Sequence, residues 1–135
     1  MASGIYSRFK ANLMNKVVDL EADTIKVALL SNSHAFTATN TVWSDISANE
    51  LASGSGYTTG GAALAGMAVT EGATTKWDAT DASWTGASFS AYHAVVYDTT
   101  ATSNLICSID FGGVKTVASG TFTIQWHTDG IITLT

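Results

Sequence analysis

Short stretches in which apolar and polar residues alternate dominate the chain from residue 63 to its end. The clearest of them is Thr121–His127, where three large apolar residues alternate with polar ones, and Asn104–Phe111 shows a similar pattern. Alternation with a period of two predicts strands that bury one face. Turn signals such as Gly112-Gly113 and Asp129-Gly130 separate the stretches at intervals of roughly ten residues. The pattern predicts a mainly β protein, an antiparallel β-sandwich or β-barrel-like domain.

An amphipathic helix is predicted near the N-terminus, over residues 3–20. Apolar residues recur there at spacings of three and four, which places them on one stripe of a helix. Ser3 is the expected N-cap. We expect the stripe to dock against the domain or against a neighbouring subunit. The recurring residues are Ile5, Phe9, Leu13, Val17 and Leu20.

The 135 residues fit one domain, with the N-terminal helix in residues 1–22 and a β body in residues 23–135. Thr24–Leu30 is predicted to form a buried strand. A long polar loop follows at residues 31–63, and a short helical turn is expected within it at Ser44–Leu51. Because a structureless loop of this length is unusual in a compact domain, we expect it to serve as an arm or contact loop.

Charged residues make up only 13% of the chain, about half the usual share, and the net charge is −5. An acidic body without a basic stripe argues against a nucleic-acid partner and against binding to an anionic membrane. The sequence contains neither a long apolar run nor the apolar core of a signal peptide. We therefore expect a soluble protein that is made in a cytoplasm.

The residues that could take part in catalysis or metal binding do not form a recognisable motif. His34, His93 and His127 lack metal-ligand spacing, and the acidic residues within 78–81 are typical of a turn. The glycine-rich stretch at residues 54–61 lacks the lysine of a phosphate-binding loop. We therefore expect no catalytic, cofactor-binding or metal-binding residues, and no enzymatic activity.

Several sequence segments together resemble a known group of proteins. In chain order they include SDISANE, GYTTGG, IDFGG, FTIQW and DGI, and the similarity runs from about Phe9 to Leu134. This order resembles a family of small virion proteins of tailed bacteriophages, which are described as head-decoration or capsid cement proteins. The segments are stretches of similar residue pattern and not catalytic motifs, so the resemblance implies no active-site residues.

The resemblance implies a β protomer without a cofactor, assembled as a homo-oligomer, with a trimer as the first expectation. It would be made in the bacterial host cytoplasm and would bind the major capsid protein on the outer capsid surface. The alternatives are a tail or fibre-associated β domain that contacts the host surface, a carbohydrate-binding module outside any virus and, last, an enzyme. The N-terminal stripe and the long loop supply the candidate assembly contacts, which are Ile5, Phe9, Leu13, Trp43 and Tyr57.

Overall fold

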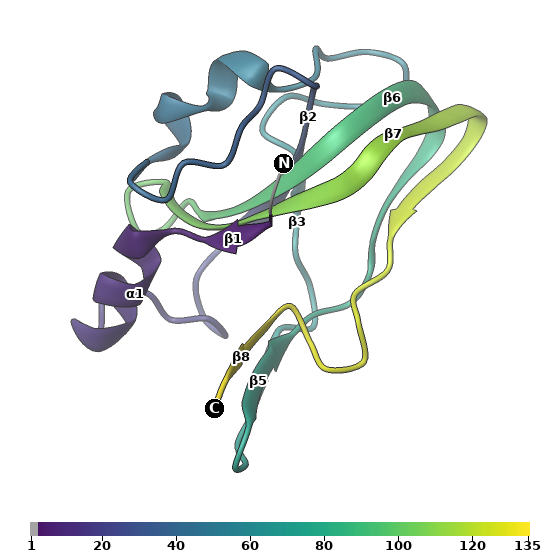
Figure 1. The fold of residues 1–135 in the computed structure, drawn as a ribbon. Helices are drawn as coiled ribbons and strands as arrows, with labels where there is room; N and C mark the ends of the chain where they lie inside the picture. Colours follow the sequence, from purple (N-terminus) through teal and green to yellow (C-terminus); the bar gives the residue numbers. More distant parts are fainter. Residues whose placement is uncertain (1–2) are drawn as a thin grey trace.

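The computed structural model describes residues 3–135, which form a mainly β fold with antiparallel sheets and one α-helix near the N-terminus (Figure 1). This confirms the predicted fold class. The elements, in chain order, are β1 (Gly4–Ile5), α1 (Ser7–Met14), β2 (Ile25–Leu30), the 3₁₀ turns η1 (Trp43–Asp45) and η2 (Ser47–Asn49), β3 (Ala62–Ala63), β4 (Ala68–Thr70), β5 (Thr75–Asp78), β6 (Ala82–Asp98), β7 (Asn104–Ile124) and β8 (Ile132–Leu134).

Two long strands, β6 and β7, form the centre of the larger sheet. They pair antiparallel from Ala82 opposite Ile124 to Asp98 opposite Asn104, around a loop at residues 99–103. The larger sheet has the order β1-β7-β6-β2-β3, and a smaller sheet has the order β4-β5-β8. Figure 1 shows the β6–β7 pair as a long curved ribbon, with β5 and β8 forming a separate lobe beneath it.

The strand predicted at Thr24–Leu30 is present as β2, and both of its faces are buried. Val27 and Leu29 pack in one hydrophobic cluster, whereas Ala28 and Leu30 pack in another. Successive strand residues point to opposite faces, so this division places one cluster on each side of the larger sheet. The β2 strand pairs with His93–Asp98 of β6, which is likewise buried on both faces.

The glycine pair at Gly112-Gly113, which predicted either a hairpin or a bulge, forms a bulge within β7. The pairing of β6 with β7 shifts register between Ala91 and His93, opposite these glycines. Their φ angles of 76° and 147° lie in a range that residues with a side chain rarely adopt. Beyond the bulge the strand continues to Ile124, and most of its residues are exposed.

The helix is shorter than the predicted span of residues 3–20, and residues 1–2 of the predicted segment lie outside the described residues. Ser3 is not its N-cap, because β1 pairs with β7 first and the Ser3 hydroxyl accepts a hydrogen bond from the Asp110 amide at 2.9 Å. The helix ends in a Schellman arrangement, in which the Val17 amide donates to the Asn12 carbonyl at 2.8 Å and Lys16 has a φ of 58°. Val17 therefore lies beyond the helix and is 48% exposed.

The long polar segment at residues 31–63 folds back onto the larger sheet instead of projecting as an arm. The predicted helical turn is present as η1 and η2. Isolated bridges join Leu30 to Glu50 and Val42 to Asn104, and the Leu105 amide donates to the Thr41 carbonyl at 2.9 Å. The segment covers a face of the sheet, and its backbone N–H and C=O groups find hydrogen-bond partners there.

We predict that Phe9→Ala lowers the free energy of unfolding by about 3–5 kcal/mol, because the side chain is 1% exposed and its removal leaves a cavity. Urea denaturation followed by circular dichroism would measure this loss. Met14→Ala is the matched control, since Met14 belongs to the same helix and is 89% exposed. Equal losses in the two variants would show that the helix does not depend on Phe9 for docking.

Candidate functional site

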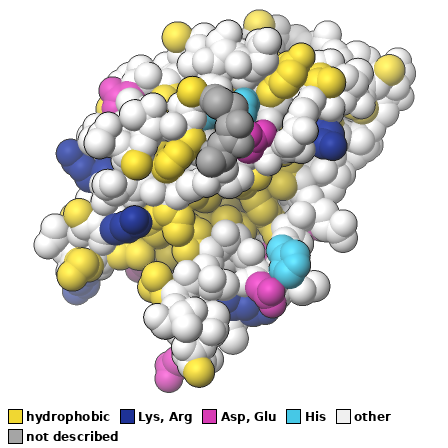
Figure 2. All heavy atoms as spheres, in the orientation of Figure 1, with side chains coloured by type: hydrophobic (Ala, Val, Ile, Leu, Met, Phe, Trp, Pro, Cys, Tyr) yellow, Lys and Arg dark blue, Asp and Glu magenta, His cyan; other side chains and the backbone are white. Residues whose placement is uncertain are grey.

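An apolar cleft lies beside the lobe formed by β5 and β8, and one part of it faces the larger sheet while the other part faces α1. The three-stranded sheet covers only part of the larger sheet, and Figure 2 shows apolar side chains at the floor of the resulting hollow. The cleft consists of two hollows of about 490 and 530 Å³. Ile131 lines the first hollow and Ile132 lines the second, so the two flank the start of β8. We call the two hollows together the apolar cleft.

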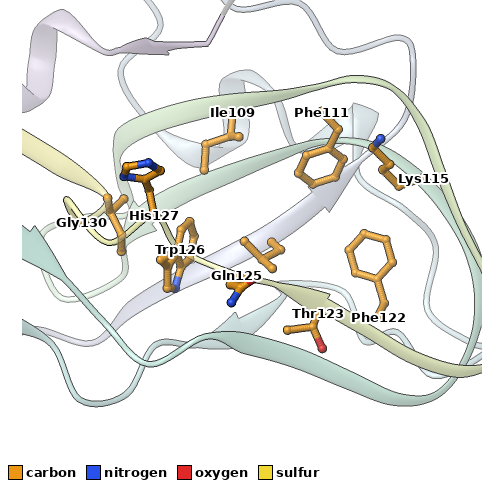
Figure 3. A pocket seen from close by; sticks show the side chains of 11 residues that line it. Ile109, Phe111, Lys115, Phe122, Thr123, Gln125, Trp126, His127 and Gly130 are labelled. Carbon is orange, nitrogen blue, oxygen red and sulfur yellow. The ribbon is translucent and has the colours of Figure 1, made fainter.

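The first hollow lies along the far half of β7 (Figure 3). The alternation predicted from the sequence directs Phe122, Ile124 and Trp126 toward this side, although β7 itself ends at Ile124. Trp126 is held in place because its ring Nε1 donates to the Thr80 carbonyl at 3.2 Å. The lining residues are Ile109, Phe111, Lys115, Phe122, Thr123, Ile124, Gln125, Trp126, His127, Gly130 and Ile131.

The second hollow lies between α1 and the smaller sheet. Leu13 lines it from the helix, and Trp77 lines it from β5. The Trp77 ring Nε1 donates to the Leu20 carbonyl at 3.0 Å, which ties the segment after the helix to the smaller sheet. Leu134 also lines this hollow and is 58% exposed. The apolar surface therefore reaches the outside of the molecule.

The outer edge of β7 lacks protection over much of its length. Strand β1 covers it at Cys107 and Ser108, and Val42 bridges it at Asn104, but among residues 3–135 no strand pairs with that edge beyond Ser108. The stretch from residue 112 to residue 121 is largely exposed and carries one charged residue, Lys115. Proteins usually protect such edges with charges, prolines or covering segments. An open edge beside an apolar cleft is suited to bind another polypeptide.

The five candidate assembly contacts are found in different environments. Phe9 and Tyr57 are buried in the core of the protomer itself, 1% and 2% exposed, and Phe9 also lines the second hollow. Ile5 and Leu13 are half-buried, and Leu13 lines the second hollow. Trp43 is half-buried and stacks on Tyr97, with ring centroids 4.5 Å apart. Their role in assembly stays a prediction.

Tyr57 instead links the long loop to the core. Its hydroxyl donates to the Glu50 carboxylate at 2.7 Å and accepts from the Leu29 amide at 3.1 Å. Burial and the adjacent Glu50 carboxylate both raise the pKa of Tyr57, so the hydroxyl keeps its proton. The Glu50 carboxylate also accepts from the Gly60 amide at 2.6 Å. These bonds make Tyr57 a structural residue.

Sequence reasoning did not single out the cleft residues Phe111 and Phe122 as contacts. Both lie in segments whose alternation predicted a buried face. The two alternating stretches, at residues 104–111 and 121–127, together predict a long apolar face, whereas β4 and β8 of the smaller sheet have only three residues each. So short a pair of strands cannot cover the whole apolar face.

The structure brings two of the three histidines together, one from the long polar segment and one from β6 of the larger sheet. His34 and His93 are 0% and 4% exposed, and their rings meet edge to face with centroids 5.0 Å apart. The Nε2 atom of His34 lies 2.9 Å from the Ser108 hydroxyl, but Ser108 is 1% exposed and unreachable for a substrate in this conformation. His127 lies apart, with its side chain 74% exposed.

Other polar residues near the predicted turns cap backbone groups. Asp45 accepts from the Thr41 amide at 2.8 Å, and such backbone hydrogen bonds lower its pKa. Asp78 accepts from the Ala79 amide and Asp81 from the Trp126 amide. Within residues 3–135, no cluster of three or more His, Cys, Asp or Glu side chains could hold a metal ion.

The part of the chain that the structure describes contains no helix with the length and apolar character needed to cross a membrane.

No family model, curated protein or solved structure matches this chain.

We predict that Tyr57→Phe lowers the free energy of unfolding by about 1–3 kcal/mol, because it leaves the buried Leu29 amide without its acceptor. Chemical denaturation at neutral pH would measure the change. Tyr92→Phe is the matched control, since Tyr92 lies on the same sheet and is only half-buried. A Tyr57→Phe variant as stable as the wild type would show that the hydroxyl does not anchor the loop.

Proposed function

We propose that this protein is a non-enzymatic structural protein of a tailed-phage particle that binds the outer surface of the capsid lattice and stabilises it. The apolar cleft is the observation that carries the proposal. Its two hollows, of about 490 and 530 Å³, expose aromatic and aliphatic side chains to water. Covering these side chains with a partner would lower the free energy, and exposed apolar surfaces of this kind mark interaction sites. The sequence resemblance to head-decoration proteins supports the same conclusion.

The cleft fits a protein partner that offers apolar side chains on an extended segment. Such a segment could pair with the open edge of β7 while alternate side chains enter the first hollow. The major capsid protein is the proposed donor of this segment. Copies of the chain would meet one another through other surfaces, and a trimer is the proposed assembly.

Stabilisation would follow from mass action rather than from catalysis. A protein that binds the assembled lattice but not its dissociated subunits lowers the free energy of the assembled state. Contacts that span the junction between two capsid subunits would have this property. A surface poor in charge and rich in hydroxyl groups would allow many copies to sit close together without strong mutual repulsion.

Immunogold labelling of purified phage particles with an antibody against this chain would test the location. Gold over the heads is the expected result. Gold confined to the tails would overturn the capsid proposal in favour of a tail or fibre domain that contacts the host surface. Particles without gold would exclude a structural role in the mature virion.

We predict that Phe111→Ser weakens binding to capsids that lack this protein by about ten- to a hundredfold, because a buried Phe side chain contributes about 1.5–3 kcal/mol. Phe111 lines the first hollow and is half-buried in the free protomer. Co-sedimentation with such capsids over a range of protein concentrations would measure the affinity.

Met14→Ser is the matched control for this experiment. Met14 lies on α1, outside the open edge of β7, is 89% exposed and does not line either hollow. Neither substitution alters charge. Equal affinities of the two folded variants, verified by thermal denaturation, would show that the partner does not enter the cleft.

A further inference from the structure

The segment Ser31–Thr41, which we call the strap, holds the N-terminal elements onto the larger sheet. Its Ala38 carbonyl accepts from the Ser7 amide, at the start of α1, at 3.0 Å. Its Phe36 ring packs on Tyr6, with ring centroids 5.0 Å apart, and lies so close to Gly4 of β1 that no side chain would fit there. The strap therefore clamps β1 and the start of α1 from outside.

A single buried side chain, His34, fastens the strap to the sheet beneath it. It is fully buried, and its Nε2 atom lies 2.9 Å from the Ser108 hydroxyl of β7. Its other ring nitrogen, Nδ1, is buried and has no hydrogen-bond partner among the described residues. The edge of its ring meets His93 of β6. The site thus accommodates a neutral imidazole and offers little to an imidazolium.

The titratable groups around the two imidazoles give His34 no compensating negative charge. Tyr6 lies on the side of the N-terminal segment, and burial raises its pKa to about 12, so it stays neutral. Cys107 on β7 is also buried, and burial raises the pKa of its thiol to about 12. Among the described residues, the nearby carboxylate belongs to Asp110 and lies beside the other imidazole, with its Oδ1 atom 4.0 Å from Nδ1 of His93.

We propose that the strap is an acid-sensitive latch: protonation of His34 expels it from the site beside His93 and Ser108 and releases residues 31–41 from β1 and α1. This inference is independent of the proposed function. The strap contains no strand or helix of its own, whereas the sheet beneath it is held by the pairing of β2, β6 and β7. Release of the strap therefore leaves the central sheet intact.

The sign of the pH dependence follows from the environment of His34. Burial, and after it the neighbouring His93, lowers the pKa of His34 to about 4 in the closed state. In an open strap the pKa returns to about 6.5. The open state therefore binds more protons between these values, so the closed state is fully favoured above about pH 6.5. The equilibrium constant for closing the strap falls by up to tenfold per pH unit as the pH drops toward 4.

Amide hydrogen exchange of the full chain, followed by NMR between pH 7 and pH 5, tests the latch. The reporters are the Ser7 and Leu105 amides, which donate to the strap carbonyls of Ala38 and Thr41, and core amides such as Val95 serve as the reference. After correction for intrinsic exchange, we expect the protection factors of the reporter amides to fall at least tenfold between pH 7 and pH 5. The core amides should remain better protected than the reporters at every pH.

His34→Gln should abolish the pH dependence of the reporters, whereas His127→Gln, at an exposed histidine, should leave it unchanged. If His34→Gln does not fold, His34→Phe provides a second ring that cannot be protonated. The latch would be overturned by a reporter protection that stays constant with pH, by a pH dependence that survives in the His34 variant, or by reporters and core opening together.

Discussion

The antiparallel pairing of β6 with β7 is the constraint on which the rest of the structure depends. Its half nearest the 99–103 loop is buried on both faces, because β2 extends the sheet and the clusters around Leu29 and Leu30 cover its two sides. The connecting loop is closed by Asp98, whose carboxylate accepts from the Thr100 and Ala101 amides at 2.9 and 3.1 Å. The N-terminal strand and the long polar segment, which includes the strap, both attach to this buried half.

The far half of the same pairing has a different environment, and the candidate site results from that difference. The small sheet covers only part of its inner face, which leaves the apolar cleft, and its outer face meets solvent. Hydroxyl pairs link the strands on that outer face, at 3.0 Å between Ser83 and Thr123 and at 2.8 Å between Ser90 and Thr116. Hydroxyl groups thus provide both solubility and cross-strand contacts where other proteins use charges.

Much of the fold was predictable because local patterns express it directly. The β2 strand, the 3₁₀ turns and the alternation that ends at Trp126 all follow from periodicity and turn residues. The helix boundaries were not predictable, because Ile5 pairs with β7 and Val17 follows a left-handed Lys16, and both positions continue the apolar stripe of a helix. Strand pairing interrupted the helical period at the N-terminal end, and a local helix cap interrupted it at the C-terminal end.

The sequence by itself determined that this chain would be a low-charge, antiparallel β protein with one short amphipathic helix, because these properties reside in composition and in residue spacing. Only the tertiary structure decided which apolar residues remain uncovered and which polar residues meet. Tyr57 fills the protomer's own core, whereas Phe111 faces an open cleft, and His34 meets His93 across 59 positions of sequence. Alternation marks a face as apolar, but the length of the opposing sheet determines whether that face is covered.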